Sequence, residues 1–133
     1  MFEWKSEFSV NIVSIDAQHQ TLFRLAEDLY QAMSRGQAKQ AMAKILDRLV
    51  QYTTMHFAHE ERLLKLHRYP DFAAHQAEHE ALTARVRQFQ ADFQSGKVNM
   101  TVQVLHFLKD WLEKHIKHSD QRYSPFLKQR AVA

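Results

Sequence analysis

Two pairs of residues in this chain are spaced so that they could bind a metal ion. His56 and Glu60 form the first pair, in the segment HFAHE, and His75 and His79 form the second, in HQAEH. On a helix, residues four apart lie one above the other on the same face. Each pair therefore presents two ligand-type side chains in one direction, the direction in which the apolar side chains of its segment also point.

Three further positions could complete a site with these pairs. His19 lies on the apolar face of the first expected helix, and His115 continues the apolar stripe of the last one. The final position is ambiguous, because Asp120 is rotated by about 140° from His115 on an ideal helix. His118 would align better with His115. Either His118 is the ligand, or the helix loosens after His115 and turns Asp120 inward.

Each candidate also has an ordinary structural interpretation. A single His on an apolar face, such as His19, is more often a hydrogen-bonded core residue than a ligand. Glu60 could be a solvated side chain beside Glu61, but it continues a buried stripe, where an unpaired carboxylate would be costly. His59 competes for a ligand role three residues after His56, and we expect it at the edge of the stripe or at the surface.

Four segments carry apolar side chains at helical spacing, each bounded by capping or breaking residues. The expected helices run from Ser14 or Asp16 to Arg35, from Ala38 to Leu66, from Asp71 to Ser95, and from Asn99 or Thr101 onward. Long helices with short connections predict an all-α protein, an antiparallel up-down four-helix bundle. We expect an extended N-terminal arm over residues 1–14, a short C-terminal helical segment, and a single domain over residues 1–133.

The composition excludes several classes of site and protein. The 133 residues include no Cys, so disulfides and thiolate metal sites are excluded and any metal would be bound through nitrogen and oxygen. The net charge is +3 with Lys and Arg scattered, which does not indicate a nucleic-acid partner. No apolar run is long enough for membrane insertion and the N-terminus does not resemble a signal peptide, so we expect a cytoplasmic protein.

The number of candidate ligands indicates more than one metal ion. An octahedral ion takes about six donors, whereas His19, His56, Glu60, His75, His79, His115 and Asp120 make seven. Five imidazoles with two carboxylates therefore predict two ions that share the carboxylates. This set of donors suits iron, and donor type alone leaves zinc, copper and manganese open.

This pattern resembles the hemerythrin family in its single-domain form, the bacteriohemerythrins. The matching residues are His19 in IDAQH, His56 and Glu60 in HFAHE, His75 and His79 in HQAEH, and His115 and Asp120 in WLEKHIKHSD. The match covers the chain from Trp4 to Tyr123. The resemblance implies a non-heme di-iron centre, with an oxo or hydroxo bridge, that binds O2 reversibly for storage, transport or delivery.

The resemblance also assigns a role to each ligand. Glu60 and Asp120 would bridge the two irons, and the HxxxxD spacing of the family favours Asp120 over His118. In the family, the remaining ligands divide between a six-coordinate iron and an iron with an open position for O2. The first iron would be completed by His75, His79 and His115, and the second would be held by His19 and His56.

Other functions could use the same centre, namely an oxidase or peroxidase, or a sensor or metal-handling module. Carboxylate-rich di-iron sites with Glu-x-x-His pairs supply more negative charge and suit O2 activation, and the core positions here hold no such pair. We therefore expect a binding protein and not an enzyme, with Trp111, Leu112 and Ile116 lining a dry O2 pocket or filling ordinary core. No motif identifies an O2-consuming protein that would receive the gas.

Overall fold

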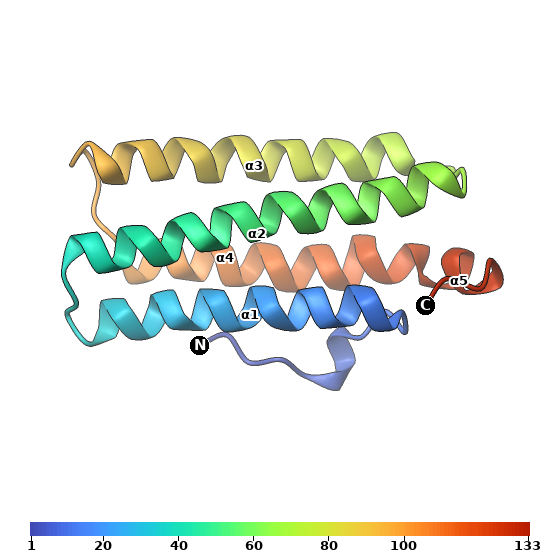
Figure 1. Ribbon diagram of the computed structural model, residues 1–133, viewed down its shortest axis with the longest axis horizontal. Coiled ribbons are helices and arrows are strands. Elements are labelled where there is room, and N and C mark those ends of the chain that lie inside the picture. Colours follow the sequence, from blue (N-terminus) through green and yellow to red (C-terminus); the bar gives the residue numbers. More distant parts are fainter.

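The computed structural model describes residues 1–133, and its architecture is a bundle of four long helices. These are α1 (Val13–Ser34), α2 (Lys39–Leu66), α3 (Phe72–Gln94) and α4 (Val102–Lys114). The helices lie side by side and alternate in direction (Figure 1), which confirms the predicted antiparallel four-helix bundle. A π-helical segment (His115–Asp120) and a short helix, α5 (Gln121–Gln129), follow α4. None of the helices combines the length and the hydropathy that a membrane span requires.

The helix boundaries follow local chemistry, with two differences from expectation. Thr101 caps α4 as predicted, since its side chain accepts a hydrogen bond from the Val104 N–H at 3.3 Å. The predicted side-chain cap of α1 is wrong, because the helix begins at Val13 and no side chain caps it. Asp71 occupies the N-cap position of α3 as predicted, but its side chain makes no capping hydrogen bond.

Asp16 anchors the N-terminal arm instead of capping α1. Its carboxylate accepts hydrogen bonds from the Ser9 hydroxyl and from the Val10 N–H, the latter at 2.8 Å. The arm runs along the bundle below α1 in Figure 1 and includes one short 3-10 turn (Ser6–Phe8). Its apolar side chains Phe2, Phe8, Val10 and Ile12 are buried. The expectation of an extended arm laid over the helical surface is therefore confirmed.

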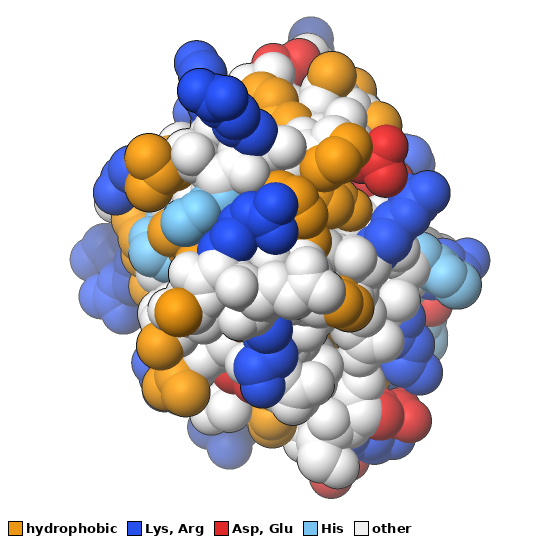
Figure 2. All heavy atoms as spheres, turned by 90° about the vertical axis from the view of Figure 1, so that its right-hand side faces the viewer, with side chains coloured by type: hydrophobic (Ala, Val, Ile, Leu, Met, Phe, Trp, Pro, Cys, Tyr) orange, Lys and Arg blue, Asp and Glu red, His pale blue; other side chains and the backbone are white.

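The apolar core forms two clusters, and a set of buried polar residues lies between them. One cluster includes Leu22, Leu29, Leu46, Phe93 and Leu105. The other, at the end where α1 begins and α2 ends, includes Ile15, Phe23, Leu64, Ile116 and Tyr123. Figure 2 shows this end of the molecule, where Lys and Arg side chains are dispersed among hydrophobic ones. Between the two clusters, the bundle buries five His and two acidic side chains.

Glu27 connects the start of the chain to α1, and its contribution to the stability of the fold should depend on pH. Its Oε1 accepts hydrogen bonds from the N-terminal ammonium at 2.9 Å and from the Phe2 N–H at 2.8 Å. Burial favours the neutral carboxyl, but hydrogen bonds from Gln31 and Phe2 and the ammonium charge hold the pKa of Glu27 below its usual value. This stabilisation is present at neutral pH and is lost as the pH falls through the lowered pKa.

We therefore expect Glu27→Gln to lower the free energy of unfolding by about 1 kcal/mol at neutral pH. In acid, where the Glu27 carboxylate becomes protonated in the parent protein, the difference between variant and parent should shrink. Denaturant unfolding of both proteins over a range of pH measures this difference. An equal destabilisation at every pH would show that the charge of Glu27 does not contribute.

Candidate metal centre

All seven side chains singled out in the sequence meet at one place inside the bundle. They come from α1, α2, α3 and the π-helical segment, and every one is buried. They form two groups that share Glu60 and Asp120, and in each group the candidate ligand atoms lie within 4.8 Å of one another. The first group adds His75, His79 and His115, and the second adds His19 and His56. The geometry fits the expected division into two sites, while the assignment of each residue as a ligand stays a prediction.

Glu60 faces both groups, one with each oxygen. Its Oε1 lies 2.7 Å from Nε2 of His75 and 3.3 Å from Nε2 of His79. Its Oε2 lies 2.9 Å from Nε2 of His56 and 3.5 Å from Nε2 of His19. A carboxylate in this position can bridge two cations, one in each group.

Asp120 repeats this arrangement from the opposite side of the bundle. Its Oδ1 lies 3.1 Å from Nε2 of His75 and also 3.1 Å from Nε2 of His115. Its Oδ2 lies 3.1 Å from Nε2 of His19, in the other group. The two carboxylates therefore span the same pair of positions.

The π-helical segment decides between Asp120 and His118 as the inward-facing residue. A π-helix pairs residues five apart, so its turn is wider than that of an α-helix. The segment begins at His115 and ends at Asp120, which brings both side chains to the same interior point. Asp120 is completely buried, whereas His118 is exposed to solvent. The structure thus corresponds to the alternative in which the helix loosens after His115.

Several buried polar atoms of these two groups have no hydrogen-bond partner, and this shows whether the groups suit a metal ion. Both ring nitrogens of His19, Oε2 of Glu60 and both oxygens of Asp120 are buried and form no hydrogen bond. The short distances between these oxygens and the histidine nitrogens are therefore contacts without hydrogen-bond geometry. The Nε2 atoms of His79 and His115 face each other at 3.0 Å. Buried polar atoms are rarely left unpaired, and a cation in each group would satisfy these atoms together. The residues fit a metal-binding site.

The buried carboxylates and histidines shift one another's pKa values strongly. Burial alone would lower the pKa of His19, but Asp120 and Glu60 raise it to about 9. Burial also opposes the charge on His75, and the same two carboxylates raise its pKa to about 10. Burial disfavours charged Glu60 and Asp120, yet the histidines hold the pKa of both carboxyls below the usual range. Protons on His19 and His75 thus balance the carboxylates.

A sequence model of a known domain family matches residues 10–127, the family described as the hemerythrin HHE cation binding domain. The chain belongs to the hemerythrin family. It is 35% identical to the bacteriohemerythrin of Methylococcus capsulatus over 122 residues, 92% of each chain. It is 31% identical to a hemerythrin of Sipunculus nudus over 130 residues, 95% of this chain and 93% of the other. The crystal structure of a wild-type hemerythrin superposes with a TM-score of 0.90 at 34% identity, covering 94% of this chain and 96% of that one.

Around this candidate centre, polar side chains contact three of the histidine rings at Nδ1, the ring nitrogen that faces away from the carboxylates. An acceptor on Nδ1 keeps the proton there and leaves the Nε2 lone pair free for a metal. The acceptors lie on α1, α2 and α3. The pairs are His56 with Gln18 Oε1 at 2.7 Å, His79 with Glu61 Oε2 at 2.9 Å, and His115 with Glu78 Oε2 at 3.2 Å.

The sequence interpretation missed the role of these outer residues. It placed Glu61 on the polar face and did not single out Gln18 or Glu78. Each one directly adjoins a candidate ligand in the sequence, so a search for hydrogen-bonding neighbours of the ligands could have found all three. His59, considered as a competing ligand, is half-buried and belongs to neither group.

Gln18 should therefore affect metal affinity without contacting a metal. We expect Gln18→Leu to weaken metal binding by about 10–100-fold, because the His56 ring loses the acceptor that fixes its orientation and tautomer. Titration of the metal-free protein with Fe²⁺ against a competing chelator measures this change. Gln20→Leu is the control, since Gln20 is exposed on the same helix. Equal affinities of the two variants would contradict the role of Gln18.

Aromatic and aliphatic side chains surround the centre. The Trp111 ring is stacked on that of His115, with ring centroids 4.4 Å apart, and the Phe57 ring is stacked on that of His79 at 3.7 Å. Trp111 and Leu112 line a small cavity of about 30 Å³. Ile116 is not part of this lining and packs in the apolar cluster at the end where α1 begins. The role of these residues toward O2 stays a prediction.

Tyr123 is a further residue of the centre that sequence reasoning did not find. Its ring lies 5.4 Å from that of His75, and its buried hydroxyl has no hydrogen-bond partner. Burial, with the charges of Glu60 and Asp120 next, raises the pKa of Tyr123 well above its usual value, so the hydroxyl keeps its proton. Two other tyrosines, Tyr30 and Tyr52, pack against the other apolar cluster.

Proposed function

We propose that this protein binds O2 reversibly at a di-iron centre held by the seven residues described above. The observation that carries the proposal is the position of Glu60 and Asp120, each with one oxygen toward each histidine group. Membership of the hemerythrin family, with relatives named hemerythrin and bacteriohemerythrin, supports iron and O2 over the other metals that this donor set accepts.

The two histidine groups differ in a way that suits binding of a small molecule. The group of His75, His79 and His115 supplies three imidazoles, whereas the group of His19 and His56 supplies two. With both carboxylates shared, the second group offers one donor fewer, which leaves room for an external ligand there. When bound, a pair of ferrous ions would supply the two electrons that reversible O2 binding requires.

The surroundings of the centre favour binding over catalysis. An oxidase or peroxidase requires an acid–base residue near the reacting ligand. Burial keeps Tyr123 in its neutral form, so it does not serve as a base, and Tyr30 and Tyr52 pack against the other apolar cluster. Phe57 and Trp111 cover two of the imidazoles with apolar surface. We therefore propose an O2 carrier or store and not an enzyme.

Metal analysis combined with repeated oxygenation tests this proposal. The purified, iron-loaded protein should contain about two irons per chain, consistent with two donor groups. Addition of O2 to the reduced protein should produce a visible absorption band that disappears when O2 is removed and returns in the next cycle. Immediate and permanent conversion to a ferric form, without a reversible band, would indicate an enzyme or a sensor.

A further inference from the structure

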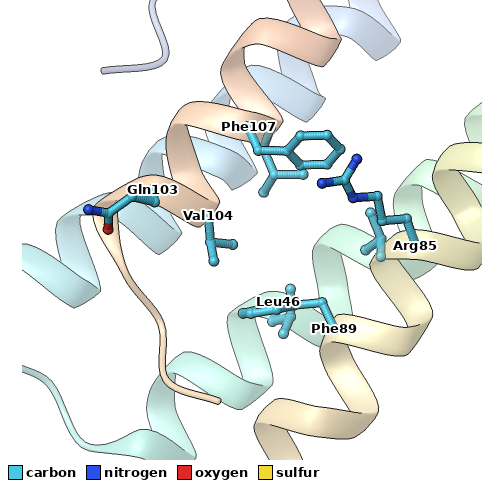
Figure 3. Close-up of a pocket in the computed structure, with 8 residues that line it drawn as sticks. Leu46, Arg85, Phe89, Gln103, Val104 and Phe107 are labelled. Carbon is cyan, nitrogen blue, oxygen red and sulfur yellow. The ribbon is translucent and has the colours of Figure 1, made fainter.

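A groove opens between α3 and α4, and none of the seven candidate ligands lines it (Figure 3). Its volume is about 250 Å³. Leu46, Val86, Phe89, Val104, Phe107 and Leu108 supply its apolar lining. Arg85 lies at this groove with its guanidinium over the Phe107 ring, 3.8 Å from the ring centroid. The groove is therefore a preformed apolar depression with a single charged residue.

A second, smaller cavity lies next to the groove and shares two of its lining residues. Val86 and Leu108 line both the groove and this inner cavity, so these two side chains form the partition between them. The inner cavity also borders Phe57 and Trp111, the rings stacked on His79 and His115. Leu22, Leu49, Thr53 and Leu112 complete most of its lining. One step through the partition thus leads from the surface groove to the side chains that cover the centre. Leu22 and Thr53 of the same cavity lie one helical turn from His19 and His56, the group with room for an external ligand.

We propose that the groove and the inner cavity are the access route of O2 to the centre, with Val86 and Leu108 as its gate. This inference rests on the proposed function. An apolar gas loses little on entering an apolar cavity, whereas a water molecule or an ion would lose its hydrogen bonds there. Leu108 can open the gate by changing rotamer on a short timescale, while Val86, β-branched on a helix, is the stiffer side.

A second groove reaches the centre from between α2 and α3, and its chemistry is different. It is lined by Glu61, Glu80, Arg87 and Thr83, among other residues, and has a volume of about 410 Å³. Phe57, stacked on His79, lies on its inner side. Charged groups and solvent suit this groove to the passage of protons or ions. It provides the competing route, and Thr83, close in size to valine and on the same helix as Val86, provides the matched control.

The kinetics of O2 binding separate the two routes. Val86→Phe should lower the association and the dissociation rate constants of O2 by the same factor, about tenfold, and leave the affinity unchanged. Val86→Ala should raise both rates, and Thr83→Phe should change neither. A gate alters the rates in both directions equally, whereas a change in the centre itself alters the affinity. Slower binding in Thr83→Phe, with normal rates in Val86→Phe, would overturn the proposal.

Xenon provides a measurement that does not depend on iron chemistry. Crystals of the metal-loaded protein under xenon pressure should show xenon in the groove and in the inner cavity beside Leu108. Val86→Phe should remove the inner atom, and Thr83→Phe should retain it. Xenon confined to the groove between α2 and α3 would refute the route. If the protein fails to bind O2 reversibly but xenon occupies the inner cavity, the proposed function fails while the gas path itself is supported.

Discussion

Asp120→Ala is expected to reduce the metal content from two ions per chain to less than one, whereas His118→Ala should leave it unchanged. Asp120 is completely buried, and its two oxygens face His75 and His115 on one side and His19 on the other. Replacing Asp120 would remove one donor oxygen from each of the two groups. His118 is exposed, two residues away on the same π-helical segment.

Elemental analysis after iron loading and removal of excess metal measures this difference. Circular dichroism shows whether each variant still forms the helical bundle. Asp120→Asn offers a milder change, since it keeps the shape of the side chain and removes the charge, and we expect it to lose metal as well. A normal metal content in Asp120→Ala, with loss in His118→Ala, would reverse the assignment and show that the π-helical segment rearranges on metal binding.

The pair Asp120 and His118 also shows what the sequence alone could predict. Ligand spacings of four residues on α2 and α3 follow directly from helix geometry, so each of these pairs could be placed on one helix face from its spacing. The helical stripes likewise predict the bundle. The five-residue step from His115 to Asp120 does not follow from spacing, because the width of a helical turn is set by packing around it and not by local propensity. The family resemblance was needed to favour Asp120.

The other differences between the sequence predictions and the structure also arise from contacts between separate segments of the chain. Asp16 has the residue type and position of a helix cap, but the arm offers it the Ser9 hydroxyl and the Val10 N–H. Glu61 and Glu78 have the types expected on a solvated helix face, yet they accept hydrogen bonds across helices or lie within ion-pair distance there. In each case a contact between distant segments decides the role of a polar side chain. Spacing within one helix cannot reveal that contact.

The stability of the protein should depend on pH in opposite ways with and without metal. In the metal-free protein, the pKa of His19 is about 9 and that of His75 is about 10, both above the usual value. A raised pKa in the folded state stabilises the fold at low pH, and this stabilisation is lost as the pH rises through the raised pKa. The metal-free bundle should therefore become less stable as the pH rises from about 6.5 to about 10.

Metal binding reverses this dependence, because an imidazole must lose its proton before it can bind a metal. Protons on His19 and His75 compete with the ions at low pH, so the apparent metal affinity should rise with pH. At a free metal concentration about 1,000 times the dissociation constant, the ions would stabilise the fold by about 4 kcal/mol. Removal of the metal by a chelator near pH 8 should then lower Tm by roughly 10 °C or more.

Thermal unfolding of the loaded and the chelated protein over the same pH range tests this expectation. The two Tm curves should diverge as the pH rises, with the gap between them widest in mildly alkaline solution and narrowest in acid. His106→Gln serves as the control, since His106 is exposed and its replacement should move neither curve. Parallel curves would mean that the metal does not replace protons on buried histidines, and the interpretation of the unpaired atoms around Glu60 and Asp120 as a metal site would then fail.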